Sequence, residues 1–305
     1  MGSNSSKVTK LRKKKSRQKQ SSNESSYSSK SSFSEEASFE SFDILPEDLT
    51  TEYEMAIARI WGMEYYSAPV DDILTTTGKI LEAGCGNGSW LINLSRIYPI
   101  AEYIGVDLNP VTNVNYPHNV TIIKGDLLSL PYDENQFDFA KMSNFSCYLT
   151  DNEWVQGISE MIRVTKCGSW VEFWEVEPIL SKNAPTYMYF VESYNEYLTL
   201  SGITGVSVTK LEYFLYSSRK LDNIQCSSKS MVIGQKGGED GIILLKCFSQ
   251  WFLELHCESL SKYMGISQEE YRRRCKIMLD EIEQTKVELI FRRFWAQKKM
   301  NPGVD

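Results

Sequence analysis

Three glycines at alternate positions follow a short apolar run in "ILEAGCGNGSW", which extends from Ile80 to Trp90. Glycines at this spacing let a ligand approach the backbone, and the start of a following helix attracts negative charge. The segment lacks the GK[ST] of a phosphate-binding P-loop, and Ser89 stands where a dinucleotide-binding turn requires Gly or Ala. The glycines alone therefore predict a ligand-binding turn without naming the ligand.

Three carboxylates narrow the choice of ligand. Glu82 precedes the first glycine by two positions, Asp107 ends the run "YIGVD", and Asp126 ends the run "VTIIKGD". At the end of its strand, Asp107 is expected to accept hydrogen bonds from both hydroxyls of a ribose, and Asp126 is expected beside the adenine amino group. Glu82 suits a cationic amino group, which it would bind directly or through water. The third acid favours S-adenosylmethionine over a nicotinamide dinucleotide.

The predicted cofactor-binding set extends to the neighbours of these residues. Its members are Glu82, Gly84, Cys85, Gly86, Gly88, Asp107, Leu108, Asp126, Leu127 and Ser143. Cys85 is expected to be a small filler, because no His lies near it in sequence. The plainer alternative is that the glycines form only a tight turn and that the acids are ordinary strand ends.

The elements that position these residues alternate along the chain. Short β-type runs ("KILEAG", "YIGVD", "VTIIKGD", "FDFAKM" and "SWVEFWEV") are separated by helical patterns, as in "DNEWVQGISEMIRVT". This order predicts an α/β domain with a parallel sheet covered on both faces, with its ligand at the carboxyl ends of the strands. Further helical patterns lie at 45–68 and 185–220, and no internal repeat is present.

The C-terminal part predicts one more helix and a last strand. Ser267 and Glu270 have the spacing of a capping box. The face of this helix is formed by Tyr271, Met278, Leu279 and Ile282. The run "VELIFRRFWA" then ends the domain.

Two segments, "ILEAGCGNGSWLINLSRIYPIAEYIGVDLNP" and "RVTKCGSWVEFWEVEP", resemble class I S-adenosylmethionine-dependent methyltransferases. Trp90 and the G-x-W-V-E of Gly168–Glu172 are most similar to the fungal LaeA-like methyltransferases. The resemblance implies a Rossmann-like, seven-stranded, mostly parallel sheet with strand order 3-2-1-4-5-7-6 and helices on both faces. It also implies one antiparallel strand, mapped to 287–297, and a helical insert or cap at about 185–285.

Four positions depart from the LaeA-like pattern. Lys141 and Ser143 replace the usual His and Arg, and Cys167 and Ser169 replace Pro and Gly of P-G-G-W. These positions are expected near the mouth of the substrate site, so the acceptor cannot be inferred by analogy.

The function predicted from these observations is S-adenosylmethionine-dependent methyl transfer to an unidentified small-molecule or protein acceptor. The rival hypotheses are a non-catalytic S-adenosylmethionine-binding regulatory or scaffold protein and an NAD-dependent oxidoreductase. Catalytic residues are not assigned, because methyl transfer needs mainly positioning and the acceptor decides whether a base is required. Glu175, Glu177 and Tyr148 are weak candidates for such a base.

Two aromatic or basic features are expected to be structural. The stripe of Tyr187, Phe190, Tyr194 and Tyr197 at helical spacing favours core packing over a substrate cage. His256, within "WFLELHCESL", is expected to be a packed or partly exposed histidine, not a base.

The first 43 of the 305 residues differ from the rest of the chain. Between Lys7 and Lys19 lie eight Lys and Arg and no acid, and a serine-rich stretch follows. This composition predicts a disordered tail at 1–43 and a methyltransferase domain at 44–300. Residues 44–305 contain 24 basic and 35 acidic residues, so the domain is acidic and a surface for duplex nucleic acid is not expected.

The tail has three interpretations. "MGSNSSK" fits an N-myristoylation signal with Gly2 as acceptor, and "KLRKKKSRQK" supplies the basic cluster that a single acyl chain needs to hold a membrane. The same cluster fits a nuclear-localisation sequence, and the tail is otherwise a solvated segment. The expected location is cytoplasmic or nuclear, with peripheral membrane association through Gly2 as a hypothesis.

Cysteine and histidine usage argues against a metal site. The seven cysteines form no CxxC pair, which is typical of reduced thiols, and only His118 and His256 are present. No metal is predicted. No apolar run approaches the roughly 20 residues of a membrane-spanning helix, and a secretory signal is not expected. The oligomeric state is left open.

Overall fold

The computed structural model describes residues 46–111, 115–204 and 208–300. The chain divides into two units, residues 1–38 and 39–305, and every described residue belongs to the second unit. The predicted tail at 1–43, with Gly2 and the basic cluster, lies outside the described residues.

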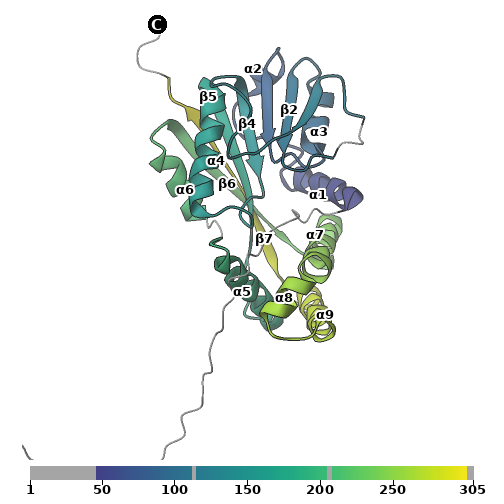
Figure 1. Cartoon of the computed structure of the whole chain (residues 1–305). Helices are drawn as coiled ribbons and strands as arrows, with labels where there is room; N and C mark the ends of the chain where they lie inside the picture. Colours follow the sequence, from purple (N-terminus) through teal and green to yellow (C-terminus); the bar gives the residue numbers. More distant parts are fainter. Residues whose placement is uncertain (1–45, 112–114, 205–207, 301–305) are drawn as a thin grey trace, which may run out of the picture. The chain divides into compact units, whose positions relative to one another are not determined.

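The described residues contain one seven-stranded sheet with the order β3-β2-β1-β4-β5-β7-β6 (Figure 1). The strands are β1 (Lys79–Ala83), β2 (Glu102–Asp107), β3 (Val120–Lys124), β4 (Phe137–Ser143), β5 (Thr165–Pro178), β6 (Leu221–Val232) and β7 (Glu288–Lys298). β1 to β5 pair in parallel, whereas β7 is antiparallel to both β5 and β6. The predicted strand order and the single antiparallel strand are confirmed.

The central strands are apolar on both faces because both faces are covered. In β1, Ile80 packs into the core on one side of the sheet and Leu81 packs into the core on the other. An exception crosses the centre of the sheet, where the strand register aligns Glu82 of β1, Lys141 of β4 and Glu172 of β5. Three charged side chains in one row of a buried sheet need partners.

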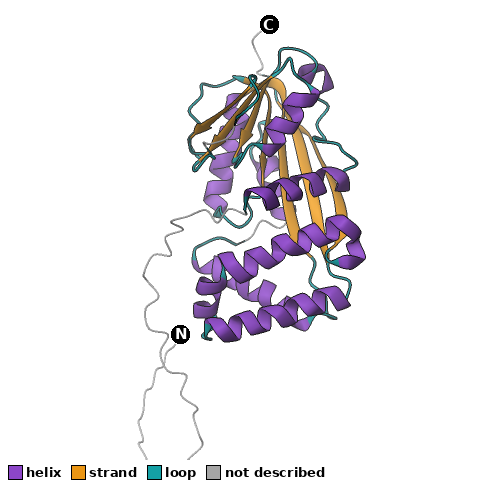
Figure 2. Ribbon diagram, turned by 90° about the vertical axis from the view of Figure 1, so that its right-hand side faces the viewer, coloured by secondary structure: helices purple, strands orange, loops and turns teal. Residues whose placement is uncertain are grey.

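Helices cover the two faces as predicted (Figure 2). α1 (Glu47–Ile60) and α3 (Ser89–Ile97) contribute Ile57, Leu91 and Leu94 to the core that contains Ile80. On the opposite face, α4 (Asp151–Val164) and α6 (Val208–Ser217) contribute Trp154 and Leu211 to the core that contains Leu81. The short α2 (Asp71–Leu74) precedes β1.

The segment at 185–285, predicted to be a helical cap, also contains β6, which forms an edge of the sheet. The resemblance implied a sixth strand in the sheet, but its residues were not located in the sequence, where helices separate it from β7. The other elements of this part are α5 (Pro185–Leu200), the 3-10 turn η1 (Gln235–Gly237), α7 (Gly238–Gln250), the π-helical turn η2 (Trp251–Leu255), α8 (Cys257–Tyr263) and α9 (Gln268–Gln284). α5, α7, α8 and α9 gather together below the sheet in Figure 1.

The predicted capping box at α9 is only half formed. Glu270 N–H donates to Ser267 Oγ at 3.2 Å, but the Glu270 carboxylate turns to Arg273 and Arg274, each at 2.7 Å. A complete capping box instead begins α4, between Thr150 and Glu153. The predicted apolar face of α9 is confirmed, with Tyr271, Met278 and Ile282 fully buried and Leu279 packed against the same core.

Within the described residues, no helix is both long enough and apolar enough to span a bilayer.

Candidate functional site

A cavity of about 1340 Å³ lies where the turns after β1 to β4 meet α1, α5, α7 and η2. Nine of the ten predicted cofactor-binding residues line it, and only Gly88 does not. The sheet topology brings these residues together because the carboxyl ends of parallel strands open at the same edge.

The turn after β1 is held by the acid that ends β2. Gly86 N–H donates to Asp107 Oδ2 at 2.8 Å, and Asn109 N–H donates to Asp107 Oδ1 at 2.8 Å. These two bonds fix the orientation of the Asp107 carboxylate and leave lone pairs on both oxygens for a ligand. Gly86 has φ +53°, and a Cβ there would meet no atom within 4 Å, so its missing side chain leaves space open at the turn.

Gly88 is needed for packing. It has φ +73° directly before α3, and a Cβ there would lie 2.4 Å from Ile122 Cδ1 of β3. The structure therefore places this glycine against the sheet, behind the turn, and away from the cavity lining. The sequence pattern could not tell a glycine that leaves space for a ligand, as at Gly86, from one that allows close packing, as at Gly88.

The acid after β3 lies at the rim of the cavity. Asp126 Oδ1 accepts the Leu128 N–H at 2.8 Å, which shapes the local turn, and Leu127 is buried beside it. Leu108 is 37% exposed and lines the same part of the cavity. Asp107 and Asp126 therefore stand at the tips of adjacent strands with apolar neighbours, an arrangement that suits a nucleoside.

The third predicted acid, Glu82, is buried, and only one of its two carboxylate oxygens has a partner among the described residues. Its Oε1 accepts from Lys141 Nζ at 2.6 Å, and the two side chains are 5% and 1% exposed. Its Oε2 is buried and has no hydrogen-bond partner among the described residues. Burial raises the pKa of Glu82 to about 7, against the lowering effect of Lys141. A second cation at Oε2 would satisfy the unpaired oxygen and stabilise the charged form.

Lys141 is held between aromatic rings. Its Nζ lies 4.5 Å from the centroid of Trp90 and 4.3 Å from that of Trp174. The stack continues through Arg293, whose guanidinium lies 3.7 Å from Trp174 and 4.2 Å from Trp61. Two buried cations thus alternate with three tryptophans behind the cavity, and each cation is stabilised by ring faces as well as by carboxylates.

The expectation that the departures from the LaeA-like pattern lie at the substrate mouth is wrong for three of the four positions. Lys141 is 1% exposed within the sheet, and neither Cys167 nor Ser169 lines the cavity. The latter two stand near the start of β5, whereas the cavity is reached by its opposite end, at Val176 and beyond. Ser143 alone lies at the cavity, at the end of β4.

Glu175, a weak candidate for a base, instead holds the loop after β4 through its carboxylate. Its two carboxylate oxygens accept the N–H groups of Phe145 at 2.8 Å and Ser146 at 3.1 Å. The residue does not line the large cavity. Burial raises its pKa to about 7, but both of its oxygens hold the loop after β4 in place. Glu175 is therefore a positioning residue.

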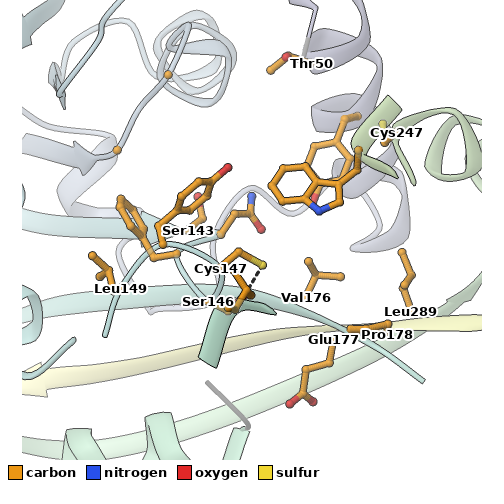
Figure 3. A pocket seen from close by; sticks show the side chains of 18 of the residues that line it. Thr50, Ser143, Ser146, Cys147, Leu149, Val176, Glu177, Pro178, Cys247 and Leu289 are labelled. Atoms are coloured by element: carbon orange, nitrogen blue, oxygen red, sulfur yellow. Dashed lines mark hydrogen bonds between the residues drawn. The ribbon is translucent and has the colours of Figure 1, made fainter. Parts of the chain in front are cut away.

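The other two candidates line the cavity. The Glu177 carboxylate pairs with Arg292 Nε at 3.2 Å, and Figure 3 shows it pointing away from Val176 and Cys147. Tyr148 contacts the ring of Trp251, with centroids 6.4 Å apart. Neither arrangement identifies a base.

The expectation for the aromatic stripe on α5 is confirmed for Tyr187 and Phe190, which are fully buried in the core. Tyr194 is buried too, but it also forms part of the cavity wall. His256 is packed against Tyr194 and Trp251, and burial lowers its pKa to about 4, so it is neutral near pH 7. It does not line the cavity.

Residues from α1 complete the site and were missed in the sequence. Tyr53 and Glu54 line the cavity, and Tyr53 is hydrogen-bonded to Asn144. Burial raises the pKa of Glu54, while Lys141 and Arg293 act to lower it. Nothing distinguished these residues in the sequence, because they lie in an ordinary helical pattern before the glycine turn.

No group of three or more His, Cys, Asp or Glu side chains that could hold a metal ion occurs within residues 46–111, 115–204 and 208–300. All seven cysteines are free thiols.

Comparison with known proteins agrees with this geometry. Residues 80–168 match the family model described as a methyltransferase domain. This segment runs from β1 into the start of β5 and contains the glycine turn, Glu82 of β1, Asp107 of β2 and Asp126 after β3.

Curated relatives match over part of their length. Methyltransferase str2 of Strobilurus tenacellus is 32% identical over 116 residues, covering 38% of this chain and 40% of that protein. The secondary metabolism regulator laeA of Aspergillus fumisynnematus is 46% identical over 44 residues, covering 14% of this chain and 12% of that protein. The chain thus spans two fifths or less of the length of these two relatives.

Among solved structures, Haemonchus contortus phosphoethanolamine N-methyltransferase 2 in complex with S-adenosyl-L-methionine has a TM-score of 0.46 and 17% identity. The match covers 82% of this chain and 52% of the Haemonchus contortus chain. The strand order and the glycine turn are those of a Rossmann-like methyltransferase fold, and residues 80–168 carry the match to the methyltransferase domain.

Proposed function

We propose that this chain binds S-adenosylmethionine and transfers its methyl group to an acceptor held in the same cavity. The observation that carries the proposal is the unpaired, buried Oε2 of Glu82 in the same cavity wall as Asp107 and Asp126. One ligand that has an amino group, a ribose and an adenine uses all three carboxylates, and the structural neighbour named above is a complex with S-adenosyl-L-methionine.

The volume of the cavity supports the same function. Sites for a single small ligand are typically about 300–1,000 Å³. At about 1340 Å³, the cavity is larger, and its lining extends from the predicted cofactor residues to the helical layer of α5, α7 and η2. A cofactor and a small acceptor fit side by side, which favours a small molecule over a protein as the acceptor.

The bound cofactor supplies an electrophilic methyl group on a sulfonium. The residues of this chain act by positioning: Asp107 and Asp126 hold the nucleoside end, and Glu82 holds the amino group. The cavity walls orient the acceptor and exclude water, and a fixed geometry of this kind accounts for much of the rate enhancement in such a displacement. The Glu175 bonds hold in place the loop after β4, which lines the cavity with Phe145 and Ser146.

Calorimetry with S-adenosylmethionine and with NAD tests the cofactor. We expect binding of the former alone, and binding of NAD alone would favour the oxidoreductase. A radiolabelled methyl donor incubated with the protein and fractionated cell extract then tests transfer. Label in a metabolite fraction supports the enzyme, whereas tight cofactor binding with no label in any fraction favours the regulatory or scaffold protein.

A further inference from the structure

The part of the cavity beyond the predicted cofactor residues has apolar and aromatic walls. They come from the carboxyl end of β5, the start of β7 and the helices α5, α7 and η2. The residues of this acceptor chamber that the argument uses are Val176, Tyr194, Phe248, Trp251 and Leu289. In Figure 3, Val176 and Leu289 point to the side of the strands opposite the Glu177 carboxylate.

The charge of the lining is one-sided. No Lys, Arg or His belongs to the lining formed by the described residues, whereas Glu and Asp occur along its whole length. The cations nearest to the site, Lys141 and Arg293, lie in the sheet behind it and are covered by tryptophan rings. A phosphate or carboxylate on the acceptor would lose its hydration here without gaining a counter-charge.

Two polar groups of the cavity lining near the chamber have partners in the protein. The Tyr194 hydroxyl lies 3.5 Å from His256 Nε2, and the Glu177 carboxylate is paired with Arg292. Glu54 is different, because it lines both the large cavity and the small one beside Arg293. Its charge also acts on Glu82, and it lines the same cavity as the cofactor residues and the chamber.

From these features, we infer that the acceptor is a largely apolar small molecule that carries no negative charge and whose nucleophilic hydroxyl or amine faces Glu54. This inference rests on the proposed function. A lone pair of the nucleophilic oxygen or nitrogen forms the new bond to the methyl carbon, and the carbon–sulfur bond breaks with its electrons remaining on sulfur. The proton of the hydroxyl or amine passes to the Glu54 carboxylate and then to solvent.

A matched set of naphthalene probes tests the charge of the acceptor. The set consists of 2-naphthylmethanol, 2-naphthoate and 2-naphthylmethylammonium, which share the ring and differ in charge. Each is titrated by calorimetry into the full chain saturated with S-adenosylhomocysteine. We expect the alcohol and the ammonium each to bind at least tenfold more tightly than the carboxylate. Tighter binding of the carboxylate than of the alcohol, or no binding of all three, overturns the inference.

Two lysine variants test whether the missing cation causes the preference. Val176→Lys adds a cation to the chamber wall and is expected to raise the affinity of the carboxylate relative to the alcohol at least tenfold. Tyr213→Lys adds the same charge on α6 at a site that is 66% exposed and outside the cavity lining, and it should leave the ratio unchanged. An unchanged ratio in Val176→Lys, with wild-type cofactor binding and thermal stability, contradicts the inference.

Glu54→Gln tests the position of the nucleophile. With an acceptor identified from the labelled fractions, the variant is expected to lower the rate of transfer at least tenfold while cofactor affinity stays within twofold. An unchanged rate removes Glu54 from the inference. Failure of the inference and failure of the proposed function remain distinguishable, because S-adenosylmethionine binding is measured separately on each protein.

Discussion

The two ends of the cavity are built by different means. The cofactor end comes from one stretch of the chain, from Glu82 to Ser143, and depends on Asp107 and Asp126, which backbone N–H groups orient, and on Glu82, which Lys141 holds. The acceptor chamber is assembled from α1, β5, α5, α7, η2 and β7, elements that are far apart in the sequence, and it depends on aromatic packing. The difference teaches that one cavity combines a local motif with a surface that only folding creates.

The cofactor end also depends on charges buried behind it. Lys141 and Arg293 alternate with tryptophans, and the carboxylates of Glu82 and Glu54 act on these cations. The acceptor chamber contains no comparable charge pair apart from Glu177 with Arg292 at its edge, as far as the described residues show. Substitutions at the two ends should therefore have separable effects.

The largest effect is expected from Lys141→Met. Removing one partner of a buried ion pair typically costs about 3–5 kcal/mol, because the other charge is left without compensation. The raised pKa of Glu82 allows it to take up a proton, so we expect a loss at the lower limit, about 3 kcal/mol, in the free energy of unfolding. Denaturant unfolding at pH 8 measures it, and Lys141→Met with Glu82→Gln should recover part of the loss. A loss below about 1 kcal/mol would show that the pair is not important for stability.

Asp107→Ala should weaken S-adenosylmethionine binding about a hundredfold. Two charge-assisted hydrogen bonds to a ribose contribute about 3 kcal/mol together. The same variant should leave the affinity for 2-naphthylmethanol within twofold, because Asp107 lies at the other end of the cavity. Calorimetry with both ligands measures this, and Asp222→Ala, at an exposed acid of β6, serves as the control. An equal loss for both ligands would mean that the two ends are not separable.

Trp251→Ala is the reciprocal test at the acceptor chamber. Its ring packs near Tyr194, with centroids 6.1 Å apart, and near Tyr148. Loss of one aromatic wall should weaken 2-naphthylmethanol about tenfold, while S-adenosylmethionine affinity changes less than twofold. Calorimetry again gives both values. A tenfold loss of cofactor affinity with retained thermal stability would show that Trp251 belongs to the cofactor end of the cavity, contrary to its assignment to the acceptor chamber.

A pH dependence of cofactor binding should distinguish Glu82 from the rest of the site. Its pKa in the free protein is about 7, and a cationic amino group favours the ionised carboxylate. Binding is therefore strongest above pH 7 and weakens as pH falls through it, by up to about eightfold between pH 7.5 and 6. Calorimetry in buffers of different ionisation enthalpy measures the proton released on binding, and Glu82→Gln should abolish that release. A wild-type affinity that is flat over this range contradicts the assignment.

The parallel strands could be predicted from the sequence because each is a short, continuous apolar run, and such a run is visible without knowing its neighbours in the fold. The consecutive apolar residues Ile80 and Leu81 indicate a strand that is covered on both faces. Asp107 stands at the end of β2, and Asp126 stands two residues after β3. The residues that form β6 were not predicted, because many of them are polar and exposed and their partner β7 lies beyond α7, α8 and α9. Long-range pairing of this kind leaves no local pattern in a single sequence.

The roles of individual side chains were less accessible. Ser267 and Glu270 had the spacing of a capping box, but two arginines on the same helix competed for the carboxylate. Lys141 was expected at the substrate mouth, but the register of β4 against β1 directs it to Glu82. In both cases the outcome depended on which neighbour lay closer after folding.

By itself, the sequence determined the fold class, the glycine turn and the three acids of the cofactor end. These features are set by spacing along a continuous segment, and the topology of a parallel sheet places them at one edge. Only the tertiary structure decided the acceptor chamber, the cation–tryptophan stack and the position of Glu54. Their chemistry arises when side chains from distant segments are buried together, because burial and proximity, not residue type alone, set their charge and their partners.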